Sequence, residues 1–228
     1  MDSQVKQIKK GIPRQQTLSI GKRVLLLVLV WCVQSFYIPT SNRTFGGIEP
    51  KLPLDVFPVW AIWVVPYVLC YLVWISMALW AIFKMDDHLF RSLIAAALIT
   101  CTLAVSTFIF FPTYVRAEHI PGSDFASRLL NFIHQNGGRY NAFPSGHVYI
   151  TVPLALFYNL WYPRHKFYWI LLPVVIAFST LFTHQHYIVD VVGGIVVAWV
   201  GYYSGLLWAR FFPLPEHQEN RRLMRPPF

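Results

Sequence analysis

The chain has 228 residues, of which 56% are hydrophobic and only 13% are charged, whereas an ordinary soluble domain is about 25% charged. This composition excludes a soluble or disordered chain and predicts a membrane protein. The formal net charge is +9, but in a membrane protein a basic excess usually reflects which loops face the cytoplasm, so no nucleic-acid partner is expected. The cysteines Cys32, Cys70 and Cys101 lie in apolar runs and are interpreted as packing residues rather than as a disulfide framework.

The predicted fold is all-α, a polytopic bundle of six membrane-crossing helices, because the apolar stretches are each close to the 20 or so residues that one crossing needs. The tails at 1–23 and 213–228 flank one catalytic membrane domain at 24–212. Residues 1–23 have no apolar core, so a cleaved signal peptide is not expected. Pro66 lies inside the second crossing, where a kink is tolerable because neighbouring helices can satisfy the freed carbonyl. In chain order, the predicted crossings cover about 24–42, 56–83, 92–115, 148–162, 167–183 and 187–209.

Six crossings place both tails and the loops at 84–91 and 163–166 on one side, together with fourteen of the nineteen lysines and arginines. The positive-inside rule then predicts a multi-pass integral membrane protein with cytoplasmic termini and an extracytoplasmic loop at 113–147. In that loop Ser123 is expected to cap a short helix. This helix either lies flat on the membrane surface or packs on the ends of the crossing helices. Its apolar side would comprise Phe125, Leu129, Phe132 and Ile133.

Three motifs are predicted to share the extracytoplasmic face: residues 111–116, 141–147 and 183–190. Between His147 and His186 the chain crosses the membrane inward and returns, so the two histidines finish on one side. His186 and Asp190 are four residues apart and lie on one face of a helix. The carboxylate can then accept a hydrogen bond from one imidazole nitrogen and leave the other free as a nucleophile or base. The alternative for Asp190 is an ion pair or a helix cap at the membrane interface.

The Pro-Ser-Gly-His sequence at 144–147 is typical of a helix start. Ser145 can cap the helix, Gly146 admits a close ligand, and the free N–H groups of the first turn favour an anion. With Arg116 as a cation, His147 as an acid and His186 as a nucleophile, this set suits phosphoryl transfer.

At these residues the sequence resembles the type 2 phosphatidic acid phosphatase (PAP2) superfamily, over about residues 50–205. The Pro-Ser-Gly-His motif and the His-x-x-x-Asp motif match in order. The resemblance implies that His186 attacks phosphorus, Asp190 orients His186, and His147 protonates the leaving oxygen. It also implies that Ser145, Gly146 and Arg116 hold the phosphate oxygens, without a metal or other cofactor.

Two departures from the phosphatase pattern remove expected phosphate-binding cations. Ile109 occupies the position of a lysine in the phosphatase pattern. Thr180, which follows Ser179, occupies the position of an arginine. A third departure is Ala117, which occupies the position of a proline. Inositol phosphorylceramide and sphingomyelin synthases also differ from the phosphatase pattern at these positions. Their Leu-Pro-Asp loop and third motif are similar to residues 52–55 and 184–187, which favours that branch of the superfamily.

Other residues carry weaker indications. His184 is expected in a loop with a supporting role, and a metal pair with His186 is not expected because no third ligand has suitable spacing. Arg128 and Arg139 are interpreted as headgroup anchors, with the alternative that they supply the missing positive charge. Gly193 and Gly194 are expected to allow close helix packing.

The function predicted is that of a membrane lipid phosphatase, which hydrolyses a lipid phosphate monoester or diphosphate through a phosphohistidine at the extracytoplasmic face. One alternative is a lipid phosphotransferase that passes a phospho-headgroup to a lipid alcohol. A second alternative is a non-catalytic membrane scaffold or transporter. The expected partners are the lipid phosphate substrate and the surrounding membrane lipids.

Overall fold

A computed structural model describes residues 18–42, 46–116, 118–138 and 140–212. Residues 1–17 of the predicted N-terminal tail (1–23) and the whole predicted tail at 213–228 lie outside the described residues, as do Ala117 and Arg139. The described residues are mainly helical and contain no β-strand, only isolated bridges. The all-α prediction is therefore confirmed for this part of the chain.

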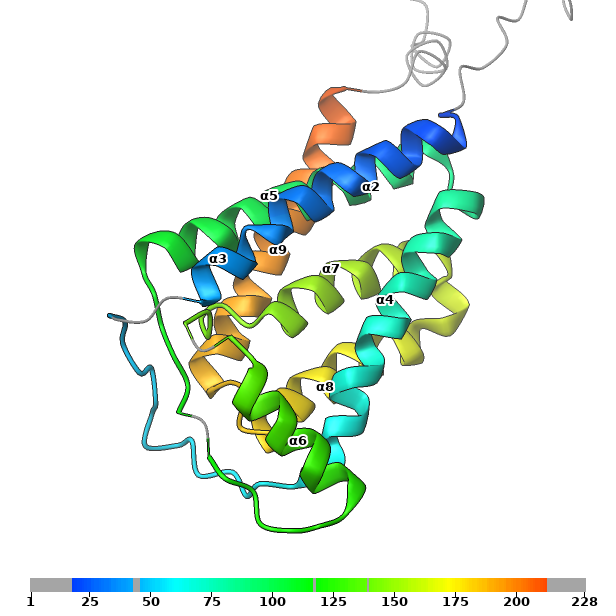
Figure 1. Ribbon diagram of the computed structural model, residues 1–228. Helices are drawn as coiled ribbons and strands as arrows, with labels where there is room; N and C mark the ends of the chain where they lie inside the picture. Colours follow the sequence, from blue (N-terminus) through cyan, green and yellow to red (C-terminus); the bar gives the residue numbers. More distant parts are fainter. Residues whose placement is uncertain (1–17, 43–45, 117, 139, 213–228) are drawn as a thin grey trace, which may run out of the picture.

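In the described part of the chain, the helices α2, α4, α5, α7, α8 and α9 form the bundle, and the shorter α3 and α6 sit at one end of it (Figure 1). Of the described helical segments, five are apolar and long enough to cross a membrane: 20–41, 61–84, 87–110, 163–182 and 188–211. They fit an integral membrane protein. The helices in chain order are α2 Ile20–Ser35, α3 Tyr37–Ser41, η1 Ala61–Trp63, α4 Val64–Lys84, α5 Asp87–Phe110, α6 Phe125–Asn136, α7 Gly146–Trp161, η2 Pro163–His165, α8 Lys166–Phe182 and α9 Ile188–Phe211.

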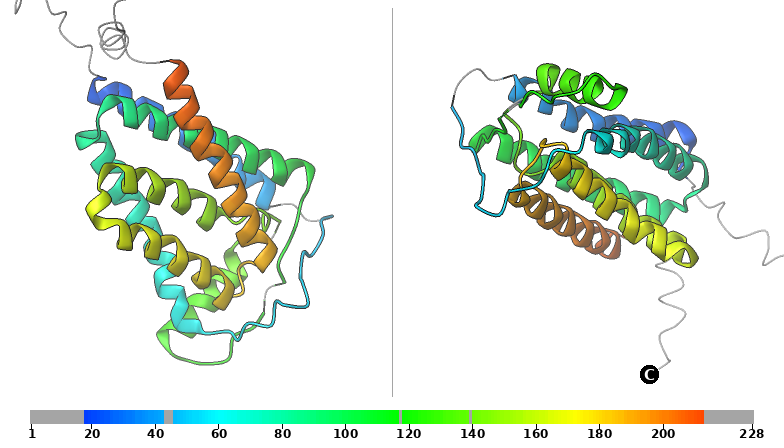
Figure 2. Two further views of the ribbon diagram at one scale, coloured as in Figure 1. Left: turned by 180° about the vertical axis from the view of Figure 1, so that it is seen from behind. Right: turned by 90° about the horizontal axis from the view of Figure 1, so that it is seen from below.

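The fourth predicted crossing, α7, differs from the other five in length and burial. It has 16 residues and spans about 24 Å, less than the roughly 30 Å of a bilayer core. It packs against α5, α8 and α9 in the middle of the bundle (Figure 2), and nine of its residues are buried. A helix surrounded by other helices does not have to match the lipid thickness, so its shortness is tolerated.

Several predicted boundaries need correction. The helix expected from residue 24 begins at Ile20, inside the predicted tail. The third crossing ends at Phe110 rather than near residue 115. Pro66 lies in the first turn of α4 rather than inside the helix. In the first turn its missing N–H has no intrahelical partner to lose, so no kink has to be tolerated.

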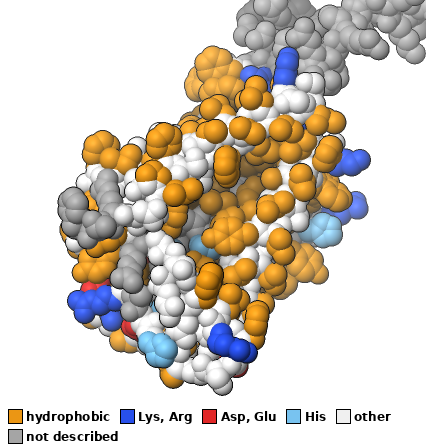
Figure 3. Space-filling model, viewed as in Figure 1, with side chains coloured by type: hydrophobic (Ala, Val, Ile, Leu, Met, Phe, Trp, Pro, Cys, Tyr) orange, Lys and Arg blue, Asp and Glu red, His pale blue; other side chains and the backbone are white. Residues whose placement is uncertain are grey.

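The outer surface of the bundle is strongly apolar. Large side chains such as Leu25, Leu72, Phe167 and Val196 are more than half exposed, and hydrophobic atoms dominate the face in Figure 3. Soluble monomers rarely expose such contiguous apolar surface. This surface is what a lipid environment requires.

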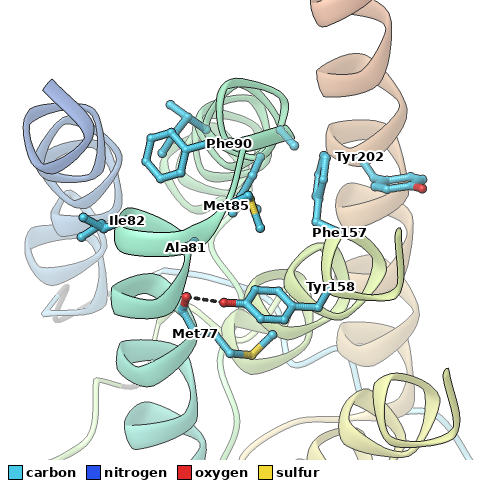
Figure 4. Packing of buried hydrophobic residues seen from close by; sticks show 11 residues of the cluster. Met77, Ala81, Ile82, Met85, Phe90, Phe157, Tyr158 and Tyr202 are labelled. Atoms are coloured by element: carbon cyan, nitrogen blue, oxygen red, sulfur yellow. Dashed lines mark hydrogen bonds between the residues drawn. The ribbon is translucent and has the colours of Figure 1, made fainter. Parts of the chain in front are cut away.

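The start of α2 and the end of α9 lie at the same end of the bundle, opposite α6 (Figure 1). This end is packed by a cluster that includes Met77, Phe90, Phe157 and Tyr158, and the Tyr158 hydroxyl donates to the Met77 carbonyl (Figure 4). Here Arg23 is buried, although it was predicted to belong to the polar tail at 1–23. It donates to the Ala81 and Ile82 carbonyls at the end of α4, pairs with Asp87 and lies over the Phe90 ring.

The opposite end is covered by α6 and by extended segments. Asp124, not Ser123, caps α6, because its Oδ1 accepts from the Ala126 and Ser127 amides. Hydrogen bonds from the Ser127 hydroxyl and amide hold the pKa of the Asp124 carboxyl below its usual value. α6 buries Ala126, Ser127, Leu130 and His134 and packs on η1 and α4. The packed alternative thus describes α6 better than a helix lying on lipid.

Candidate active site

Backbone hydrogen bonds join the first motif to the second. The buried Thr113 accepts at its hydroxyl from the Phe143 amide (2.7 Å) and at its carbonyl from the Ala142 amide (3.2 Å). On its other side it forms a bridge with Ile48. The segments around residues 48, 113 and 141 therefore lie side by side and form isolated parallel bridges, although they are far apart in the sequence.

The start of α7 is anchored on α9. The Ser145 amide donates to the Asp190 carbonyl, with N and O 2.9 Å apart. Close approach is possible because α9 carries glycines here: a Cβ on Gly193 would collide with the Phe143 ring, and one on Gly194 with Val148 and the Ser145 carbonyl. The two glycines thus allow the packing that was predicted for them.

Ser145 occupies the N-cap position of α7, but its side chain makes no capping bond. The hydroxyl oxygen is fully buried and has no hydrogen-bond partner among the described residues. The amides of Gly146 and His147, in the first turn, have no intrahelical acceptor. A buried free hydroxyl beside free helix N–H groups is a suitable place for an anionic oxygen.

The prediction that His186 and Asp190 share one helix face is wrong: His186 lies in the loop between α8 and α9, and only Asp190 is helical, in the first turn of α9. The Nδ1 atom of His186 is 3.5 Å from Asp190 Oδ2, beyond the usual 2.7–3.2 Å of such a hydrogen bond, and both Nδ1 and Asp190 Oδ1 are otherwise unpartnered. Asp190 is fully buried, and its Oδ2 accepts from the Tyr187 amide. In unliganded sites such pairs are often long and tighten only when substrate binds. The carboxylate faces Nδ1, so Nε2 of His186 is left for the substrate.

His147 faces His186, with ring centroids 6.4 Å apart. α4 supplies an aromatic wall around it: Tyr67 stacks on the His147 ring at 4.0 Å, and Tyr71 and Trp74 contact it at 5.4 and 5.6 Å. Both histidines are buried, and His147 Nε2 has no partner among the described residues. A phosphoryl group between the rings can therefore contact both imidazoles.

Both histidines line a cavity of about 450 Å³ that opens between α2 and α4 (Figure 3). Its inner end is polar and also includes Gly146 and Gln185. Its outer part is aromatic and comes from α2 and α4, where Trp31 and Ile75 are more than half exposed on the outside of the bundle. Such a cavity fits an amphipathic ligand that has an anionic head and an apolar remainder.

Arg116 is at the cavity mouth and is held by an ion pair. Its Nε lies 2.9 Å from Glu49 Oε2, and its side chain is 73% exposed. The other Glu49 oxygen accepts from the Tyr187 hydroxyl (2.7 Å). Burial and this bond to Glu49 raise the pKa of Tyr187. The guanidinium thus keeps donors free for a phosphate while Glu49 fixes its position.

Residues 48–60 form an extended strap across the loop that carries His186. Asp55 Oδ1 accepts from the Ile188 amide at the start of α9 (2.8 Å). The Phe57 carbonyl bonds with Nε2 of His184, and the Trp60 amide donates to the Phe182 carbonyl. Sequence reasoning noted Asp55 only as part of a resemblance, and it missed Glu49. The sequence around an acidic residue in a short polar loop does not show which distant backbone amide will donate to it.

His184 has a backbone φ of +51° and lies in the loop, as expected. Its Nδ1 contacts Glu118 Oε2 at 3.0 Å. His134 of α6 was not predicted at all, yet it is buried and lines the cavity. Its Nε2 donates to the Thr183 carbonyl (2.8 Å), while its Nδ1 accepts from the Glu118 amide. His134 therefore ties α6 to the loop that carries His186.

Uncharged residues, Ile109 and Thr180, occupy the two positions at which the family pattern has a cation. Thr180 is buried, and its carbonyl accepts from the amides of Gln185 and His186, which shapes the loop. Ile109 lies near the end of α5 and is 40% exposed. Arg128 is exposed on α6 and lines neither cavity at the site, and Arg139 lies outside the described residues. Among the described residues, no three His, Cys, Asp or Glu side chains are grouped as metal ligands.

Comparison with known proteins agrees with this geometry. The family model of the PAP2 superfamily matches residues 56–204, which span α4 to α9 and hold both histidine motifs. The chain belongs to the PAP2 superfamily. Its membrane domain is thus of the type found in lipid phosphatases and phosphotransferases. The comparison with curated proteins gives no match.

Proposed function

We propose that the protein is a membrane lipid phosphatase that acts through a phosphohistidine on His186. The observation that carries the proposal is the pair of buried imidazoles, 6.4 Å apart between ring centroids, at the polar end of an otherwise aromatic cavity. The fully buried Asp190 behind His186 supports it, since an ionisable group so placed is costly without a use. For the same reason we do not favour a silent scaffold or a transporter.

In the first step, Nε2 of His186 attacks phosphorus and the bond from phosphorus to the lipid oxygen breaks. His147 donates its proton to that oxygen, so the lipid leaves as a neutral alcohol, or as a lipid monophosphate if the substrate is a diphosphate. Asp190 stabilises the positive charge that develops on His186. Arg116, the Ser145 hydroxyl and the Gly146 amide hold the phosphoryl oxygens.

In the second step, water attacks the phosphohistidine from the side that the lipid has left. His147, now neutral, takes the proton from this water, and the bond between phosphorus and Nε2 breaks. Inorganic phosphate leaves and both histidines regain their starting protonation.

The second candidate is a phosphotransferase in which a lipid alcohol replaces water. Ile109 and Thr180 favour it, because the synthases that the sequence resembles also lack cations there. The 450 Å³ cavity also has room beside the histidines for part of an acceptor lipid. The two candidates differ only in the group that attacks phosphorus in the second step.

The deciding experiment uses the purified full-length protein with phosphatidic acid, a polyprenyl diphosphate and headgroup-donor phospholipids, each with and without a long-chain alcohol. Free phosphate that depends on His186 supports the phosphatase. A new phospholipid species without free phosphate would instead establish the transferase. No turnover of any donor by correctly folded protein would overturn both.

A further inference from the structure

A second, smaller cleft of about 20 Å³ adjoins the histidine cavity, room for about one water molecule or one anionic oxygen. The two spaces share Val115, Arg116, His184 and His186 as lining residues. His186 therefore has the main cavity on one side and this cleft on another. A phosphoryl group bound near His186 has three terminal oxygens, and one of them can point into the cleft.

Lys51 of the strap lines this cleft. It takes part in none of the four ion pairs found among the described residues. Arg116, by contrast, has one donor committed to Glu49. Lys51 is thus an uncommitted positive charge on the cleft that borders the candidate nucleophile.

The acidic groups that line the cleft are already used. Asp55 accepts amide hydrogen bonds at both oxygens, from Ile188 at Oδ1 and from Leu52 at Oδ2. Glu118 contacts His184. Neither carboxylate is within ion-pair distance of Lys51, so the ammonium is available for an anion that enters.

We infer that Lys51 is a phosphate-binding residue that supplies one of the cations missing from the family pattern at positions 109 and 180. The inference rests on the proposed function in that it takes the bound anion to be the transferred phosphoryl group. A charge on the strap compensates for its loss from α5 and α8, because the phosphoryl oxygens need a nearby cation but not one from a particular helix.

The test measures binding of orthovanadate, which resembles five-coordinate phosphorus, to the full-length protein in nanodiscs by the rise in melting temperature. Lys51→Gln is expected to weaken the vanadate affinity about tenfold, as for the loss of one charge-assisted hydrogen bond. Lys51→Arg is expected to keep most of it. Arg128→Gln is the matched control, because it removes an exposed cation from the same end of the bundle and lines neither cavity.

Vanadate that stabilises the Lys51→Gln protein as strongly as the unmodified protein would overturn the inference. An equal loss in the Arg128→Gln control would also overturn it, because the effect would then reflect net charge. Lipid turnover is measured separately. If vanadate binding depends on Lys51 but no lipid is turned over, the result would support the anion site at Lys51 and would reject the proposed lipid phosphatase function.

Discussion

The amide of Ser145 donates a hydrogen bond to the carbonyl of Asp190, with N and O 2.9 Å apart. This bond fixes the N-terminus of α7, which carries His147, directly on the helix turn that orients His186. The distance between the two imidazoles is therefore set by local backbone contacts rather than by the packing of whole helices.

Replacing His186 by alanine should abolish the phosphoenzyme, because Nε2 of this side chain is the proposed nucleophile. Replacing His147 by alanine should slow both formation and hydrolysis of the phosphoenzyme, since one imidazole serves as acid and then as base. The measurement is rapid acid-free trapping of radiolabelled protein. His119→Ala is the control, because His119 is exposed and lines neither cavity. An acid-labile phosphoprotein that persists in His186→Ala would place the nucleophile elsewhere.

Arg116→Ala should lower turnover about 100- to 1,000-fold, the usual cost of losing one donor that stabilises the transition state. Arg116→Lys should recover only part of this, since a point charge replaces a planar fork. Steady-state kinetics on the same substrate measure both variants, with Arg128→Ala for comparison. A nearly silent Arg116→Ala would show that the first motif is misassigned.

Glu49→Gln should reduce turnover less than Arg116→Ala does. It removes the partner that positions the guanidinium but leaves the guanidinium in place. Tyr187→Phe, which loses the hydroxyl bond to Glu49, should have a still smaller effect in the same direction. The order of the three turnover rates is the measurement. A Glu49→Gln enzyme as slow as Arg116→Ala would mean that the carboxylate itself contacts the substrate.

His134→Ala should loosen α6 and the His186 loop together, because it leaves the Thr183 carbonyl and the Glu118 amide without their side-chain partner. A buried group left unpaired costs about 1–3 kcal/mol. Hydrogen exchange should increase at residues 183–186 and along α6, while α2 and α5 stay protected. Gln135→Ala, which changes the exposed neighbour on the same helix, is the control. Unchanged exchange at the loop would show that His134 does not hold it.

A cysteine in place of Asn136 should react with an impermeant reagent added outside the cell, and one in place of His165 only after lysis. Both positions are exposed, and they lie at opposite ends of the bundle. The expectation rests on the distribution of lysine and arginine. Cys32 is exposed, so the background for labelling is a Cys32→Ser protein. Reversed labelling would invert the orientation.

The membrane-crossing helices could be predicted from the sequence, because an uncharged, apolar stretch that is long enough to cross a bilayer has few stable structures other than a helix. The second and third motifs could be located for a similar reason, since a helical hairpin must return His186 to the side of His147. The error at α6 was local: Ser123 and Asp124 are adjacent residues that both cap helices well, and only the backbone geometry decides between them.

The supporting residues could not be predicted in this way. Glu49 and Arg116 are 67 positions apart, and the bond from the Trp60 amide to the Phe182 carbonyl involves no side-chain pattern. The strap has no hydrophobic periodicity, so the sequence does not show which loop it crosses. His134 falls on a helix that was predicted, but the side that packs was only partly identified, because Phe125 and Phe132 are exposed while Leu130 and His134 are buried. The polar contacts of His134 depend on where the end of α8 lies.

The opening of the cavity between α2 and α4 has a consequence for kinetics. α2 meets α4 at Arg23, and the aromatic part of the cavity opens sideways between the two helices farther along (Figure 3). A lipid can then reach His186 by diffusing in the plane of the bilayer without passing through water. The encounter rate should follow the mole fraction of substrate among the surrounding lipids, so added inert lipid should slow the enzyme even when the bulk substrate concentration is held constant.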